Sequence, residues 1–140
     1  MFKRIPYSND VGLFIIRLGL GIMFILHGLP KLMGGPKLWE GLAQKGLPML
    51  PDGFLSIVFG LAAALAEAGG GLLLILGLYY RFGCAALGVT MIVAASTKMD
   101  GVSSLYEFAK VAGWPVELAV VMIGLFIIGP GSIGFGRRSS

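Results

Sequence analysis

Four apolar stretches, each near the length of a membrane-spanning helix, constrain this chain more than any other feature. They cover about residues 11–30, 54–79, 82–97 and 113–129. A helix that crosses a bilayer needs about 20 consecutive, mostly apolar residues. Only 13% of the 140 residues are charged and 56% are hydrophobic, and a soluble chain of this size cannot bury so much apolar surface. The sequence therefore predicts an all-α membrane protein, a four-transmembrane-helix bundle that forms a single integral membrane domain over residues 1–140.

The connections between these stretches are polar. Residues 34–53 and 98–112 are each expected to form a short interfacial helix, the first with Trp39 in the aromatic belt of the bilayer. Lys3 and Arg4 precede the first apolar run, but Arg17 interrupts it, so we expect a retained first span and no cleaved signal peptide.

Four spans place both termini on one side of the membrane. The cations divide evenly between the two sides, so the positive-inside rule alone does not fix the orientation. The cations ahead of the first span, and the acids on the opposite side, favour cytoplasmic termini. We expect a multi-pass protein of the cell inner (plasma) membrane with both termini in the cytoplasm, and the lipid bilayer as its main partner.

Composition excludes several classes of site. The chain has one cysteine, Cys84, so it has no intrachain disulfide, no CxxC redox pair and no cysteine-based zinc site. One histidine among scattered methionines makes no metal site. The net charge of +4 is spread over helix ends without a basic run interleaved with aromatics, so no nucleic-acid partner is expected. Gly69-Gly70-Gly71 lacks the lysine and polar context of a phosphate loop.

Ionisable residues inside the apolar stretches are the candidates for function, because a charge in hydrocarbon is expensive and usually faces a protein interior or a cavity. On the first helix Arg17, Phe24, His27 and Lys31 fall within roughly 80° of one another. This face is expected to look into the bundle. Near the middle of the second span lies Glu67, and we expect it to form a buried ion pair with Arg17, either structural or as a proton relay.

The other expected site lies at the extracytoplasmic ends of three helices. Their positions along the spans place four residues at about one level in the membrane: His27, Lys31, Lys98 and Glu117. Our hypothesis is that these residues form a site for a ligand or a quinone. Structural roles stay open for each of them. The lysines can snorkel to the interface, Glu117 suits the first turn of a helix, and a lone histidine often serves a core hydrogen bond.

The segments RLGLGIMFILHGLPKL at 17–32, EAGGGLLLILGLYYR at 67–81 and GPG at 129–131, in this order and spacing, resemble the DoxX family of small four-helix membrane proteins. The resemblance implies a redox association, since the family is named for a subunit linked to a quinol oxidase and to thiosulfate:quinone oxidoreductase activity. The positions that it shares are Arg17, Lys31, Glu67 and Arg81, with Gly28 and Gly129 as backbone features. The chain lacks a second, soluble-type domain, which argues against thiosulfate turnover by this chain alone.

Three functional hypotheses follow. The first is a redox-associated component, a quinone-linked oxidoreductase subunit if it is an enzyme, that interacts with quinone or with a redox partner protein and has no intrinsic cofactor. The second is a non-enzymatic binding or transport-like module for a small anionic or lipid-like ligand. The third is a structural subunit of a membrane complex. The glycine-rich faces also permit a homodimer.

Overall fold

The computed structural model describes residues 8–135, which form five α-helices and no strand within that range. The helices are α1 (Ser8–Met33), α2 (Gly35–Gly46), α3 (Phe54–Leu76), α4 (Tyr80–Ser96) and α5 (Leu105–Ile128). The all-α class predicted from the sequence is confirmed.

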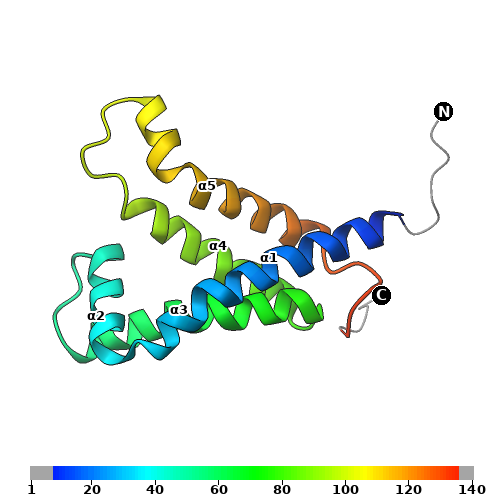
Figure 1. The fold of residues 1–140 in the computed structure, drawn as a ribbon, viewed down its shortest axis with the longest axis horizontal. Coiled ribbons are helices and arrows are strands. Elements are labelled where there is room, and N and C mark those ends of the chain that lie inside the picture. Colours follow the sequence, from blue (N-terminus) through cyan, green and yellow to red (C-terminus); the bar gives the residue numbers. More distant parts are fainter. Residues whose placement is uncertain (1–7, 136–140) are drawn as a thin grey trace.

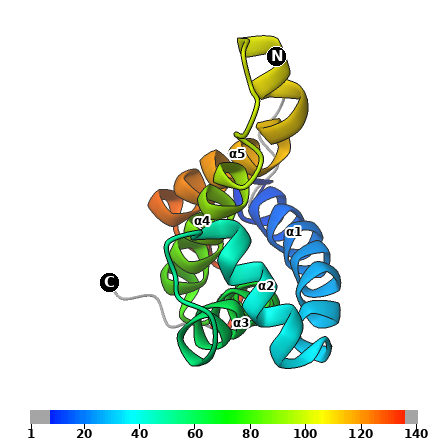
Figure 2. The ribbon, with the colours of Figure 1, turned by 90° about the vertical axis from the view of Figure 1, so that its left-hand side faces the viewer.

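The long helices form an open bundle (Figure 1) in which α1 packs on α3, α3 on α4, and α4 on α5. Within residues 8–135, α1 and α5 do not approach each other closely along their backbones. We call the end of the bundle where α1 begins and α5 finishes the terminal end. There the Asp10 carboxylate accepts hydrogen bonds from the Ser132 backbone N–H, at 3.1 Å, and from the Ser132 hydroxyl. At the opposite end, which we call the loop end, α1 and α5 splay apart (Figures 1 and 2).

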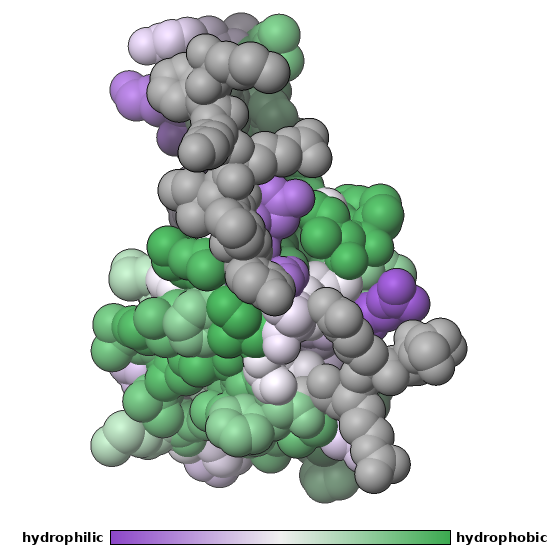
Figure 3. All heavy atoms as spheres, turned by 90° about the vertical axis from the view of Figure 1, so that its right-hand side faces the viewer, coloured by the Kyte–Doolittle hydropathy of each residue, from purple (hydrophilic) through white to green (hydrophobic). Residues whose placement is uncertain are grey.

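Three of the helices, α1, α3 and α5, are long and apolar enough to cross a membrane. The fourth apolar helix, α4, has 17 residues and falls below that length. These helices therefore make the chain a multi-pass membrane protein. By length, three helices qualify as spans, whereas the sequence predicts four. Seen from the terminal end (Figure 3), hydrophobic side chains cover much of the surface. A lipid environment explains this exposure, because soluble proteins rarely expose so large an apolar patch to water.

The predicted short helix within residues 98–112 is not a separate element. Residues 105–112 are the first turns of α5, which continues through Pro115. The helix begins at Leu105 because the Ser104 side chain caps it by accepting a hydrogen bond from the Glu107 N–H. The sequence predicts that the span starts at about residue 113, whereas the capping serine lies at position 104.

Helix α2 lies against the first half of α3. A Cβ atom at Gly60 would lie 1.8 Å from the Trp39 carbonyl oxygen, so only glycine permits this approach. Helix α1 ends beside the middle of α3. Gly28 lies there against the backbone of Ala68, where a Cβ would come within 2.5 Å of the Ala68 nitrogen.

The core lies where the four long helices meet. Its buried side chains are Phe24, Leu74, Tyr80, Cys84, Leu87, Met91, Ala119, Met122 and Leu125. Small residues bring the helices close, as at Gly71, whose Cβ would lie 2.7 Å from the Gly21 carbonyl oxygen. This core closes the bundle towards the terminal end and leaves it open towards the loop end.

Candidate functional site: a cleft between α1 and α5

A cleft of about 250 Å³ occupies the open side of the bundle between α1 and α5. Its lining residues come from four helices: Leu20, Met23, Phe24, His27 and Lys31 of α1, Glu67 of α3, Met91 of α4, and Trp114 and Leu118 of α5. The polar members, together with Trp114, lie towards the loop end, and the aliphatic members and Phe24 lie deeper. The cleft therefore has one polar end and one apolar end.

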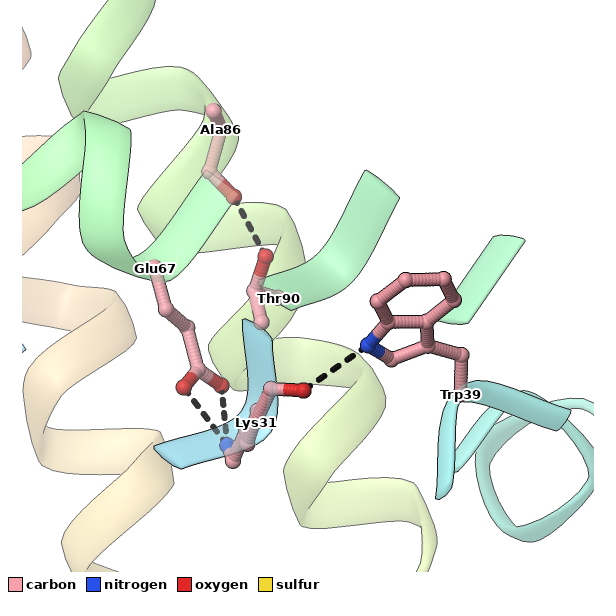
Figure 4. Close-up of polar contacts among 5 residues, drawn as sticks. All are labelled: Lys31, Trp39, Glu67, Ala86 and Thr90. Atoms are coloured by element: carbon pink, nitrogen blue, oxygen red, sulfur yellow. Dashed lines mark hydrogen bonds and ion pairs between the residues drawn. The ribbon is translucent and has the colours of Figure 1, made fainter. Parts of the chain in front are cut away.

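An ion pair forms part of the polar end. The Lys31 ammonium lies 2.6 Å from each oxygen of the Glu67 carboxylate (Figure 4). The Glu67 side chain is only 4% exposed, whereas that of Lys31 is 34% exposed. A buried carboxylate needs such a partner, because an uncompensated charge in a low-dielectric interior costs several kcal/mol. The positive charge of Lys31 and the negative charge of Glu67 thus cancel in this part of the cleft wall.

Trp39 of α2 holds the end of α1 that carries Lys31. Its indole Nε1–H donates a 2.8 Å hydrogen bond to the Lys31 carbonyl oxygen (Figure 4). The Gly34 backbone N–H donates to the same oxygen at 3.3 Å, so the indole adds a second, shorter hydrogen bond to a carbonyl in the last turn of α1. The prediction assigned Trp39 to the aromatic belt alone and did not include this contact.

His27 and Lys31 supply the hydrogen-bond donors of the cleft. An ammonium group has three N–H donors, and Glu67 accepts two of those of Lys31. One donor remains for a ligand. His27 is exposed and lines the cavity, and an imidazole can donate or accept a hydrogen bond. The site is therefore equipped to bind a neutral oxygen acceptor such as a carbonyl.

The other two residues of the predicted cluster lie elsewhere. Lys98 reaches the cleft only indirectly, because its Nζ lies 5.5 Å from the centre of the Trp114 ring, which lines the cavity. Glu117 is exposed and is absent from the cavity wall. It lies in the fourth turn of α5, because α5 begins at Leu105. The structure thus brings His27 and Lys31 together in one cleft, with Glu67 in place of Glu117.

The predicted Arg17–Glu67 ion pair is wrong. Arg17 is fully buried, but its guanidinium binds backbone carbonyls: Nε donates to Leu74 at 2.8 Å and Nη2 to Ile75 at 3.0 Å. The physical reason is the close packing of α1 on α3 at Gly28 and Ala68, which places Glu67 level with Lys31. Leu74 lies two turns further along α3, roughly 10 Å away.

Arg17 also binds the segment that follows α5. Its Nη1 donates to the carbonyls of Pro130, at 2.6 Å, and Ile133, at 2.5 Å. The guanidinium carbon lies 5.4 Å from the centre of the Tyr80 ring. A planar, forked cation suits this cage of acceptors and ring faces better than a lysine would. Arg17 therefore ties α1, α3 and the segment after α5 together at the terminal end.

Phe24, Met91, Trp114 and Leu118 are cleft residues that the sequence reasoning did not assign to the site, although it placed Phe24 on the same helix face as His27. Among the described residues no group of three or more His, Cys, Asp or Glu side chains is arranged to hold a metal ion.

A family model described as DoxX matches residues 12–99, which run from the second turn of α1 to just past the end of α4. This match includes Arg17, Lys31, Glu67 and Arg81 and stops before α5. No curated protein and no solved structure matches the chain.

Proposed function

Because the chain belongs to the DoxX family of membrane proteins, and because a cleft with a polar end opens between two of its lipid-facing helices, we propose that it binds the headgroup of a membrane quinone there. It would act as a quinone-interacting component of a redox system. The observation that carries this proposal is the gradient along the cleft, from His27, Lys31 and Trp114 at one end to Leu20 and Leu118 at the other.

The chemistry of a quinone fits that gradient. Its carbonyl oxygens accept hydrogen bonds, for which His27 and the free N–H of Lys31 are the donors. Its ring can stack on the Trp114 indole, which is 48% exposed. Its isoprenoid tail would lie along the apolar end and leave between α1 and α5 into the lipid. The quinone carries the redox chemistry, and the electrons would come from a redox partner protein.

The proposal includes four membrane crossings with both termini in the cytoplasm. The start of α1 and the segment after α5 lie together at the terminal end, which supports an even number of crossings. Helix α4 would then be the fourth span. Its 17 residues give about 25 Å, a few ångströms short of a typical hydrocarbon core of about 30 Å, which local bilayer thinning and snorkelling of Arg81 and Lys98 can accommodate.

The test is a titration of the purified, detergent-solubilised chain with a short-tailed ubiquinone and a short-tailed menaquinone, followed by tryptophan fluorescence. A Trp114→Phe variant, which keeps the hydrogen bond from Trp39 to Lys31, should lose most of the quenching and thereby assign it to Trp114. We expect saturable quenching, and a His27→Ala variant should bind at least five-fold more weakly, because one hydrogen bond to the carbonyl is lost. Leu26→Ala, one position away on the lipid-facing side and 58% exposed, is the matched control.

Two results would speak against quinone binding in the cleft. One is quenching that rises linearly with no saturation, and the other is equal affinity in the His27→Ala and Leu26→Ala variants. Saturable binding without redox turnover, in the presence of a membrane fraction that supplies partners, would instead favour a non-enzymatic binding module.

A further inference from the structure

The ion pair in the cleft wall bears on which ligands the cleft accepts. Leu20, Met23 and Leu118 line its apolar end, and such a surface binds the hydrocarbon tail of any lipid, because the hydrophobic effect is not directional. A bilayer holds anionic lipids beside neutral ones. Selection between them must therefore come from the polar end, where Lys31 and Glu67 lie.

Glu67 takes up the position from which Lys31 would attract an anion. The Lys31 ammonium lies 2.6 Å from each oxygen of the Glu67 carboxylate, so two of its three N–H donors are already used. Glu67 lines the cavity, although its side chain is almost completely buried. A ligand at the remaining N–H therefore meets a hydrogen-bond donor whose positive charge is already neutralised.

The shape of an ammonium group brings any further acceptor close to Glu67. Two oxygens that accept from different N–H groups of one tetrahedral nitrogen, each at about 2.7 Å, lie about 4.5 Å apart. Two negative charges at that separation repel each other strongly where little water screens them. A neutral carbonyl oxygen has no net charge to be repelled. The same N–H thus suits a neutral carbonyl and disfavours a carboxylate.

Three cationic or basic side chains stand in or beside the cleft and have to be considered with Glu67. Lys31 and His27 line the cavity, and the Lys98 Nζ lies 5.5 Å from the centre of the Trp114 ring. Each of them stays in place when Glu67 alone is substituted. A change in ligand selectivity that follows such a substitution therefore reports on the Glu67 carboxylate.

We propose that Glu67 determines the ligand specificity of the cleft: its carboxylate excludes anionic amphiphiles and reserves the Lys31 ammonium for neutral ligands with a carbonyl oxygen. The inference rests on the proposed function, which places the ligand headgroup at Lys31, and adds the class of membrane amphiphile that the cleft rejects. A residue that only holds α1 against α3 would not separate two ligands of similar shape by their charge.

Laurate and methyl laurate test this specificity, because they share a tail and a carbonyl and differ in charge. Binding of each tritiated ligand to the full chain in nonionic detergent is measured by scintillation proximity at pH 8, with correction for partition into empty micelles. The wild-type chain should bind methyl laurate about ten-fold or more tightly than laurate, because only laurate is repelled by Glu67. Glu67→Gln should raise the laurate affinity by about ten-fold or more and change the methyl laurate affinity by less than about three-fold.

Two control variants separate the Glu67 charge from general effects. Lys31→Met with Glu67→Gln removes both charges and should bind laurate no better than wild type, because no ammonium is freed. Glu117→Gln removes one negative charge at an exposed position outside the cavity wall and should leave both affinities unchanged. A gain in laurate affinity in either control would overturn the proposal, since loss of the ion pair or of any negative charge would then suffice.

Equal affinity of the wild-type chain for the two ligands would also overturn the proposal, and this measurement needs no variant to fold. Unchanged or weaker laurate binding by a Glu67→Gln variant that is folded by circular dichroism would do the same. The quinone titration fails separately. If the quinone binds and Glu67→Gln gains no laurate affinity, the specificity is refuted and the quinone site stands. If Glu67→Gln gains laurate affinity and the quinone does not bind, the specificity stands and the quinone assignment is refuted.

Discussion

Substitution of Lys31 should lower the free energy of unfolding more than substitution of its partner Glu67 does. Lys31→Met leaves the Glu67 carboxylate, only 4% exposed, without its partner. Breaking a buried pair in this way costs 3–5 kcal/mol, and because Lys31 is itself a third exposed we expect the low end, about 3 kcal/mol of unfolding free energy. Glu67→Gln removes the buried charge and leaves a lysine that can reach the interface. We therefore expect it to lower the unfolding free energy by only about 1 kcal/mol.

The double variant Lys31→Met with Glu67→Gln removes both charges and should cost about 1–2 kcal/mol, less than the sum of the single variants. The coupling free energy of this cycle should therefore be about 2 kcal/mol or more. The assay is reversible unfolding in mixed micelles with increasing dodecyl sulfate, followed by circular dichroism. Glu117→Gln, at an exposed position, is the control and should change stability by less than about 0.5 kcal/mol. Additive single-variant effects, or a larger loss in Glu67→Gln than in Lys31→Met, would refute the reasoning.

Two further predictions concern packing. Arg17→Lys keeps the charge but loses the forked geometry that binds four carbonyls, so it should cost about 3 kcal/mol and speed hydrogen exchange at the Phe135 amide, which donates to Leu76. Unchanged exchange there would contradict the role of Arg17 in holding the segment after α5 against α3. Gly60→Ala collides with the Trp39 carbonyl and should cost about 2 kcal/mol of unfolding free energy. Gly19→Ala, where a Cβ meets nothing within 4 Å, should be neutral or stabilising in the same unfolding assay.

Sequence patterns predicted much of the architecture, because apolar length and helical periodicity are local properties. The shared face of α1 is an example: Arg17 and Phe24 are buried, and His27 and Lys31 line the cleft. The partners of those residues were not predictable in the same way. They depend on the position of α1 along α3, which is set by the close approach of Gly28 to Ala68, a tertiary contact without a local signal.

In the cleft, too, contacts within one helix were predictable and contacts between helices were not. His27 and Lys31 were placed together because they are neighbours one helical turn apart. The prediction for Glu117 is wrong because a span that starts at about residue 113 puts Glu117 near the helix start, whereas the Ser104 cap begins the helix at Leu105. Trp114 reaches the cleft from α5, a helix that does not touch the backbone of α1. No periodicity within either helix could show that they face one cavity.

The central claim is that the cleft between α1 and α5 binds a quinone headgroup, and photoaffinity labelling tests it most directly. The full chain in lipid nanodiscs would be labelled with an azido-quinone, digested, and mapped by mass spectrometry, with unlabelled quinone as competitor. The account predicts competed labels on the cleft residues of α1 and α5, around His27 and Trp114, and their loss in the His27→Ala variant. Competed labels confined to residues outside the cleft, or labels that the competitor does not reduce, would contradict it.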